Sequence, residues 1–272
     1  MKLKNKKFII TSLTIIALFA ITVIQIGKNS GNQEETRLTS SQGLSNKKIG
    51  WGIKRNDNHE QPDLGKVNKE ILEKNNGIAM GNNNDKYIYL TFDEGYEAGH
   101  TTQILSTLKE NNVKATFFIT AHYLNTQPDL VKQMIEEGHI VGNHTVNHKS
   151  MPSLTEEQIN SEVMDLHKTI YEKFGYEMKY IRPPMGEFSE KSITVTNSLG
   201  YKTVMWSFAY EDWNENKQPE ESTAKKKIID NVHNGEIMLL HGNSTTNTNI
   251  LGDIIKEIRN MGYEFKSLDE FK

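Results

Sequence analysis

The chain has 272 residues, a formal net charge of −3 and no cysteine. This length allows one large domain or two small ones, and the slightly acidic balance provides no global field that would attract nucleic acid. We therefore expect no nucleic-acid partner. The lack of cysteine excludes disulfides, thiolate zinc sites and iron–sulfur clusters, so any metal ion must be held by His, Asp or Glu.

The amino terminus predicts a membrane-spanning helix. Residues 1–7 contain four lysines, and residues 8–26 contain no charged side chain. A helix over that run is roughly 28 Å long, close to the bilayer hydrocarbon core of about 30 Å. Because lysines favour the cytoplasmic side, we expect residues 1–27 to be a retained anchor in the cell membrane, with the rest of the chain outside the cytoplasm. The alternative is a cleaved signal peptide and a secreted protein.

The composition changes after this apolar run. Residues 28–48 are rich in Ser, Asn, Gly and Gln and predict a flexible linker, whereas residues 49–272 are expected to fold. Within the folded part, short apolar runs alternate with segments whose apolar residues recur at i, i+3 and i+4. The runs predict strands at residues 87–92, 115–119, 139–142, 179–182, 202–206, 236–240 and 263–266. This alternation implies an α/β fold with a parallel sheet, either open or closed into a barrel.

Ionisable residues follow the predicted strands repeatedly, at the ends where such folds build their active sites. Each of them alone also fits a capping, packing or surface role. Five groups from different strands are hard to attribute to chance, so we expect one site to gather them. The groups are Asp93 with Glu94, His144 with His148, Arg182, Asp212 with Trp213, and His241.

Two of these groups suggest specific chemistry. His144 and His148 are four residues apart, which on a helical turn places both imidazoles on one face, where they can bind one metal ion. Arg182 begins a rigid Arg-Pro-Pro-Met-Gly turn, and its guanidinium could orient a carboxylate through two parallel hydrogen bonds; an ion pair that only holds the fold is the alternative. We assign the other histidines to surface or packing roles, with His122 as the strongest exception because it follows a predicted strand.

The motifs occur in one order and carry a family resemblance. They are Thr91-Phe-Asp-Glu-Gly95, His144-x-x-x-His148, Arg182-Pro-Pro-x-Gly186, Asp212-Trp213 and Leu239-Leu-His241. As a set they resemble the polysaccharide deacetylase family, the NodB-homology domain of carbohydrate esterase family 4, over roughly residues 87–268. The wider wording of residues 89–96 and 138–144 is most similar to the delta-lactam-biosynthetic N-acetylmuramic acid deacetylases of spore formers.

The resemblance implies a distorted (β/α)7 barrel and metal-assisted amide hydrolysis, with zinc as the expected divalent ion. It implies that Asp93 is the general base and His241 the general acid, and that Arg182 holds Asp93 while Asp212 pairs with His241. It further assigns His144, His148 and Glu94 to the metal ion, and Trp213, Pro184 and Gly186 to the substrate pocket. The family usually has Asp at the position of Glu94, so the chain departs from the family pattern at the third metal ligand.

The expected function is N-deacetylation of N-acetylmuramic acid in peptidoglycan, leading to the muramic delta-lactam of the spore cortex. The expected partners are a peptidoglycan glycan strand and, through the amino-terminal helix, the membrane. One alternative is an N-acetylglucosamine or chitooligosaccharide deacetylase of the same family. Another is an inactive glycan-binding module, against which the intact Asp93 and His241 argue, because sugar binding alone needs neither an acid nor a base.

Overall fold

The computed structural model describes residues 41 and 43–271. The predicted anchor at residues 1–27 lies outside the described residues, as does most of the predicted linker at residues 28–48. No helix in the described part of the chain is long and apolar enough to cross a membrane. From Ser45 onward the chain forms one compact unit, which contains the sheet and the cavity described below.

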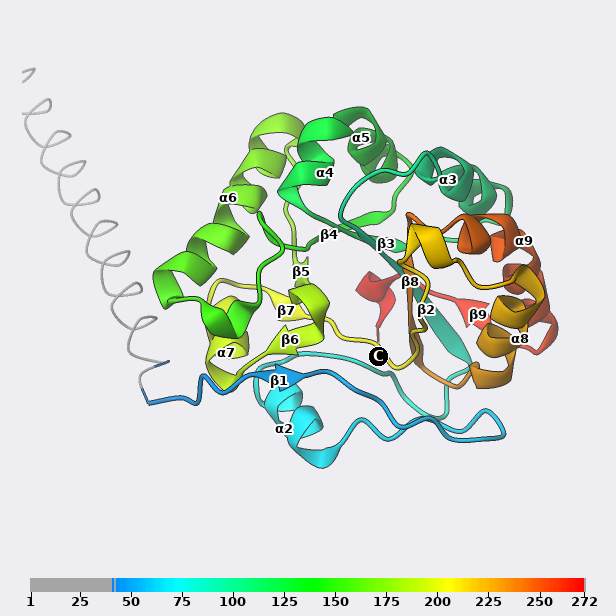
Figure 1. Cartoon of the computed structure of the whole chain (residues 1–272), viewed down its shortest axis with the longest axis horizontal. Helices are drawn as coiled ribbons and strands as arrows, with labels where there is room; N and C mark the ends of the chain where they lie inside the picture. Colours follow the sequence, from blue (N-terminus) through cyan, green and yellow to red (C-terminus); the bar gives the residue numbers. More distant parts are fainter. Residues whose placement is uncertain (1–40, 42, 272) are drawn as a thin grey trace, which may run out of the picture. The chain divides into compact units, whose positions relative to one another are not determined.

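A seven-stranded parallel sheet forms the centre of this unit (Figure 1). Its order is β7-β5-β4-β3-β2-β8, and β9 pairs with β2. The strands are β2 (Tyr87–Glu94), β3 (Thr116–Ile119), β4 (Ile140–Asn143), β5 (Tyr180–Ile181), β7 (Lys202–Thr203), β8 (Glu236–His241) and β9 (Glu264–Phe265). All seven predicted strands are therefore present, with shifted ends, and the α/β class is confirmed.

The sheet is curled, and an irregular segment lies between its two edge strands. The strand predicted at residues 202–206 ends at Thr203, and Val204 forms an isolated bridge with Ile78 from earlier in the chain. Further on, Phe208 bridges Met238 of β8 in parallel. Residues 204–208 thus lie between the edge strands β7 and β8 and contact the sheet only through isolated bridges. Because no continuous ladder joins the two edges, the curled parallel sheet is a half-barrel and not a closed barrel.

Helices cover the outer face of the sheet (Figure 1). They are α3 (Thr101–Glu110), α4 (Ala121–Thr126), α5 (Pro128–Glu136), α6 (Glu156–Phe174), α7 (Glu190–Ser198), α8 (Glu221–Asn231) and α9 (Thr245–Asn260). Their apolar faces are buried; Ile104 and Leu108 of α3 and Val163 of α6 have no exposed surface. A capping box between Thr155 and Gln158 begins α6 and satisfies backbone N–H groups that the helix itself cannot pair.

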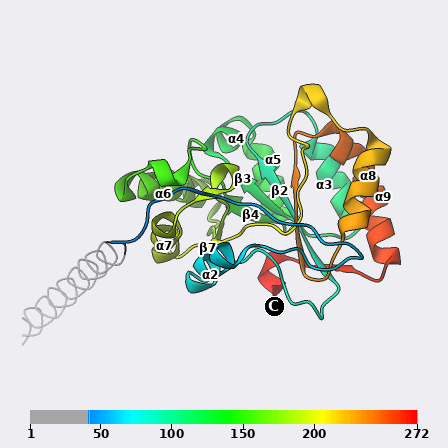
Figure 2. The ribbon, with the colours of Figure 1, turned by 60° about the horizontal axis from the view of Figure 1, so that its bottom comes forward.

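Residues 49–64, which we call the amino-terminal segment, run along the loops that follow β5 and β7 (Figure 2). The segment begins with β1 (Ile49–Gly50), which pairs antiparallel with β6 (Glu187–Phe188), and α2 (Lys66–Lys74) follows it. Trp51 fixes it in place: its backbone N–H donates to the Gly186 carbonyl at 2.8 Å, and its indole Nε1 donates to the Trp206 carbonyl at 2.9 Å. Both acceptor residues line the cavity described below.

Gly142 of β4 lets the sheet close around Phe118 of β3. The two residues are direct partners in the ladder, and a Cβ on Gly142 would lie 2.5 Å from the ring atom Cδ1 of Phe118. Gly142→Ala should therefore lower the free energy of unfolding by roughly 1–3 kcal/mol, as overpacking does in other cores. Thermal unfolding checks this, with Gly52→Ala as the control because a Cβ there meets nothing within 4 Å. Equal melting temperatures for the two variants would contradict the prediction.

Candidate active site

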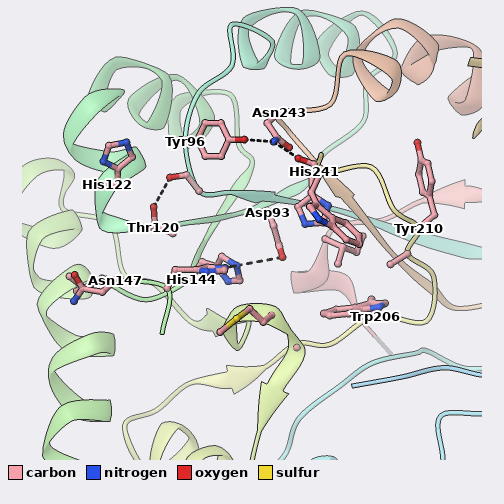
Figure 3. A pocket seen from close by; sticks show the side chains of 18 residues that line it. Asp93, Tyr96, Thr120, His122, His144, Asn147, Trp206, Tyr210, His241 and Asn243 are labelled. Atoms are coloured by element: carbon pink, nitrogen blue, oxygen red, sulfur yellow. Dashed lines mark hydrogen bonds and ion pairs between the residues drawn. The ribbon is translucent and has the colours of Figure 1, made fainter. Parts of the chain in front are cut away.

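The strand ends surround a cavity of about 1010 Å³ (Figure 3). Six of the expected site residues line it: Asp93, His144, His148, Gly186, Trp213 and His241. Four others are buried outside its lining: Glu94, Arg182, Pro184 and Asp212. The parallel sheet therefore brings residues from strand ends far apart in the sequence to one place, as the pattern predicted.

Arg182 holds Asp93 from behind the cavity wall. Its Nη1 donates to Asp93 Oδ1 at 2.8 Å, while its other donors reach the Val204 and Met205 carbonyls, so the contact with the carboxylate is single and not the two parallel bonds we expected. Burial raises the pKa of Asp93, but the charge and hydrogen bond of Arg182, with a contribution from His241, outweigh burial and keep the pKa below its usual value. Asp93 is thus an anion at neutral pH.

His144 and His148 meet across the cavity floor, although they lie in a loop after β4 and not on a helical turn. Positive φ angles at Thr145 and His148 bend this loop, and the two Nε2 atoms lie 3.1 Å apart. His144 Nδ1 donates to the Arg182 carbonyl at 2.8 Å, which leaves a lone pair on His144 Nε2. Burial lowers the pKa of His144 to about 4 and also lowers that of His148, so both rings are neutral. Neutral imidazoles facing one point fit as two ligands of a divalent ion.

Glu94 is not brought to the two histidines. It follows Asp93 in a strand, where neighbouring side chains point to opposite faces. Its Oε1 accepts a hydrogen bond from Thr101 at the start of α3. Its carboxyl group lies directly against Gly242, so closely that a Cβ on Gly242 would be 1.9 Å from Oε1. In the described part of the chain, no three His, Asp or Glu side chains are placed to hold one metal ion together. Two histidines therefore fit the expected metal ion, and Glu94 does not.

This placement makes a prediction about metal affinity. Glu94→Gln keeps the size of the side chain and removes only its charge. Because Glu94 lies away from the two histidines, the zinc dissociation constant of the purified protein should change by less than about 10-fold, whereas loss of a residue that supports a metal ligand typically costs about 10–100-fold. His148→Ala removes one of the two nitrogens and should abolish measurable binding. Calorimetric titration of zinc into the metal-free variants checks both. Equal losses in Glu94→Gln and His148→Ala would restore Glu94 as a ligand.

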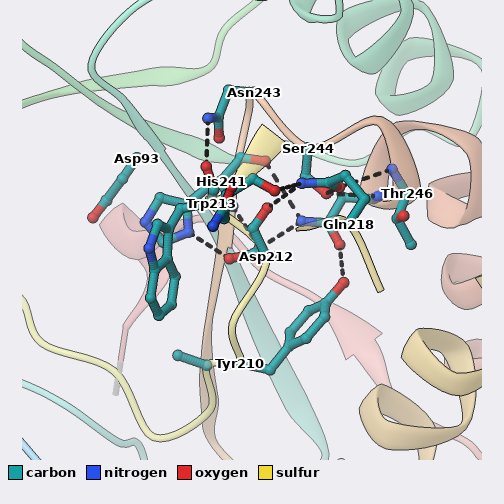
Figure 4. Close-up of polar contacts among 12 residues, drawn as sticks. Asp93, Tyr210, Asp212, Trp213, Gln218, His241, Asn243, Ser244 and Thr246 are labelled. Atoms are coloured by element: carbon teal, nitrogen blue, oxygen red, sulfur yellow. Dashed lines mark hydrogen bonds and ion pairs between the residues drawn. The ribbon is translucent and has the colours of Figure 1, made fainter. Parts of the chain in front are cut away.

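Asp212 holds His241 in a fixed orientation (Figure 4). His241 Nδ1 lies 2.7 Å from Asp212 Oδ1, and the His241 backbone N–H donates to Oδ2 at 2.9 Å. Asn247 also donates to Oδ2, at 2.6 Å, so the buried carboxylate is fully paired. Burial lowers the pKa of His241, but the charge and hydrogen bond of Asp212 outweigh burial and raise the pKa above its usual value. Asp212 therefore favours the protonated form of His241, whose Nε2 is left for a ligand in the cavity.

Several lining residues were not singled out in the sequence. Aromatic rings form much of the wall, where a sugar ring can pack against them: Tyr96, Trp206 and Tyr210 join the predicted Trp213. Asn243 donates to the Tyr96 hydroxyl at 2.8 Å and to the Trp213 carbonyl at 2.9 Å, and so ties two of these rings together. Trp206 ends a predicted strand and the others follow one, which is a signal too general to select them. His122, the exception that the sequence indicated, also lines the cavity (Figure 3).

The comparisons with known proteins agree with this geometry. The family model for polysaccharide deacetylases matches residues 80–204. The peptidoglycan-N-acetylmuramic acid deacetylase PdaA of Bacillus subtilis is 42% identical over 231 residues, which cover 85% of this chain and 88% of that protein. The chain belongs to the polysaccharide deacetylase family. The resemblance that the motifs indicated is confirmed.

Solved structures of this family share the fold. The structure of Bacillus subtilis PdaA, a family 4 carbohydrate esterase, aligns with a TM-score of 0.81 and 42% identity over 84% of this chain and 98% of that one. A family 4 carbohydrate esterase from Bacillus anthracis aligns with a TM-score of 0.72 and 40% identity over the same shares. The curled parallel half-barrel is therefore the fold of the polysaccharide deacetylases, and the chain is a hydrolase of that family.

Proposed function

We propose that the protein removes the acetyl group from N-acetylmuramic acid in peptidoglycan, and that its product gives the muramic delta-lactam of the spore cortex. One observation carries the hydrolytic chemistry: the Asp93 carboxylate and the His241 imidazole line one cavity, and each is held by a buried charged partner, Arg182 or Asp212. The 42% identity to a muramic acid deacetylase over most of its length supports this sugar as the substrate.

In the proposed reaction Asp93 and His241 move the protons. Asp93 takes a proton from a water molecule as the water oxygen adds to the acetyl carbonyl carbon. His241 then donates a proton to the sugar nitrogen as the C–N bond breaks, which leaves acetate and a free 2-amine. Arg182 and Asp212 act by orienting these two groups and fixing their charge.

The metal ion is part of the proposal. His144 and His148 would hold a divalent ion, for which we propose zinc. When bound, such an ion polarises the acetyl carbonyl and lowers the pKa of bound water toward about 7. The facing neutral imidazoles support this assignment, and Glu94 has no part in it.

The cavity wall orients the sugar in this proposal. Trp213 is half-exposed beside His241, with the two ring centroids 5.7 Å apart, so a pyranose ring can pack on the indole close to the acid. Gly186 lets the Trp206 ring pack closely against the turn, because a Cβ there would lie 2.8 Å from that ring. Pro184 does not reach the cavity and acts only through the turn that carries Met185 and Gly186 into it.

We also propose that residues 1–27 keep the enzyme in the cell membrane, with its catalytic domain facing peptidoglycan outside the cytoplasm. The four lysines followed by an uncharged apolar run support this orientation. Fractionation of cells that express the full chain checks it. A shortened protein free in the medium would show that the segment is a cleaved signal.

Substrate preference tests the proposed function. The full chain, loaded with zinc, should release acetate faster from peptide-free peptidoglycan strands than from chitin oligomers of similar length. The reverse preference would favour the N-acetylglucosamine alternative. No release from either glycan, with binding retained, would indicate an inactive glycan-binding module.

A further inference from the structure

Apart from His241, which the proposed reaction uses as the acid, the described lining of the cavity has no cationic side chain that could pair with an anionic sugar substituent. Muramic acid differs from glucosamine by a lactyl carboxylate at the 3-position, yet no lysine or arginine is among the described residues that line the cavity. Arg182 lies behind the wall, and its donors are directed at Asp93 and at two backbone carbonyls. A lactyl carboxylate therefore requires a cation from outside the lining.

Arg55 lies at the edge of the cavity. Its Nη2 donates to the carbonyl of Ala209, a lining residue, and its guanidinium carbon lies 5.7 Å from the ring centroid of Phe208. The side chain is exposed, and no carboxylate of the described residues forms an ion pair with it. A guanidinium has five N–H donors, so most of those on Arg55 remain for a ligand.

The backbone that carries Arg55 is held rigidly. Lys54 and Asp63 exchange two backbone hydrogen bonds of 2.9 Å, which close residues 54–63 into a loop. Gln61 ties this loop to the Gly81 and Asn234 carbonyls, at 3.0 and 2.8 Å. Together with the Trp51 contacts at Gly186 and Trp206, these bonds hold the backbone of Arg55 beside the cavity, and the hydrogen bond to the Ala209 carbonyl holds its guanidinium at the cavity edge. A group that is held in place before a ligand arrives loses less entropy on binding.

The neighbouring cations are less suited to this role. Lys149 follows His148, but its Nζ lies 3.7 Å from Glu162, so its charge already has a partner. Lys217 ends the short helix η3 (Glu215–Lys217) after Trp213 and has no described side-chain contact with a lining residue. Lys217 is therefore a matched control: a surface cation near the same site that lacks a contact with the cavity wall.

We propose that Arg55 binds the lactyl carboxylate of a muramic residue held in the cavity, and so determines the preference for muramic acid over glucosamine. A guanidinium and a carboxylate form short, charge-assisted hydrogen bonds, and a glucosamine residue has only a hydroxyl at that position. The inference rests on the proposed function. Arg55 has no part in the proton transfers, so it acts on substrate binding and not on the chemical step.

Steady-state kinetics of the full zinc-loaded chain test this inference. Arg55→Gln should raise KM for peptide-free muramic glycan by about 10–100-fold, the effect of losing a charged hydrogen bond, with kcat nearly unchanged. The KM of Arg55→Gln for chitin oligomers should equal that of wild type. Arg55→Lys keeps the positive charge, so its KM for muramic glycan should rise less than that of Arg55→Gln. Lys217→Gln should leave KM unchanged for both glycans. When the lactyl carboxylates of the glycan are converted to amides, the KM of wild type should rise to the value that Arg55→Gln has on the unmodified glycan.

The outcomes separate this inference from the proposed function. If wild type processes muramic glycan and Arg55→Gln has the same KM, the Arg55 assignment is wrong and the proposed function stands. Equal increases in KM on both glycans would reduce Arg55 to a structural support of the wall. If wild type releases no acetate from muramic glycan, the proposed function fails, and the Arg55 assignment fails with it.

Discussion

Asp93→Asn should lower kcat on peptide-free peptidoglycan by about 10²–10⁴, the usual contribution of a general base. The amide oxygen can still accept the hydrogen bond from Arg182, so the site should keep its shape, but an amide cannot take a proton from water at neutral pH. KM should change little, because Asp93 contributes to the chemical step. Acetate release under saturating substrate measures the effect.

Unfolding experiments must accompany this measurement, because Arg182 is completely buried and would lose its counter-charge. Leaving a buried charge without its partner typically costs about 3–5 kcal/mol of stability. The rate should be compared below the melting temperature of the variant, with Asp165→Asn on the exposed face of α6 as the control. Near-normal turnover in folded Asp93→Asn would mean that another residue is the base.

Asp212→Asn should change the pH dependence as well as the rate. Activity requires a deprotonated Asp93 and a protonated His241, so the rate should rise as pH passes the lowered pKa of Asp93 and fall as it passes the raised pKa of His241. Asp212 is the charge that raises the pKa of His241. Without this charge the effect of burial dominates, the pKa falls, and the alkaline limb should move to lower pH.

At neutral pH the rate of Asp212→Asn should therefore drop by about 10²–10⁴, as it does when a histidine loses its orienting carboxylate. His241→Ala should show a similar loss and no alkaline limb from this residue. Acetate release across the pH range, with zinc content measured at each point, checks both variants. An alkaline limb that stays in place in Asp212→Asn would show that His241 is not the acid.

The sequence predicted where the candidate acid and base lie, because the ends of strands can be recognised in it, whereas their proposed roles came from the family resemblance. Asp93 directly follows an apolar run that indicates a buried strand, and His241 directly follows another. Parallel strands bring their carboxyl ends to the same edge of a sheet. Asp93 of β2 and His241 of β8 are direct partners in the parallel ladder. No knowledge of packing was needed beyond the order of strands and helices.

Other features depend on contacts that a linear sequence does not display. Adjacency suggested that Glu94 shares the site of Asp93, but the alternation along β2 turns it toward Thr101. The strand expected at residues 202–206 stops early, and Val204 pairs instead with Ile78, which lies far away in the sequence. Arg55 reaches Ala209 across an even longer separation, and only the fold of the amino-terminal segment shows that it lies beside the cavity.

The most direct test of the proposed activity is to follow acetate and glycan products together, by mass spectrometry, after the full zinc-loaded chain is incubated with peptide-free peptidoglycan. The lactyl carboxylate and the freed amine lie on one sugar, so closure to the six-membered lactam is intramolecular and favoured. We expect one muramic residue with a free amine or a lactam for every acetate released, and neither product with Asp93→Asn. Acetate matched by free amines on glucosamine, or equal release by wild type and Asp93→Asn, would contradict it.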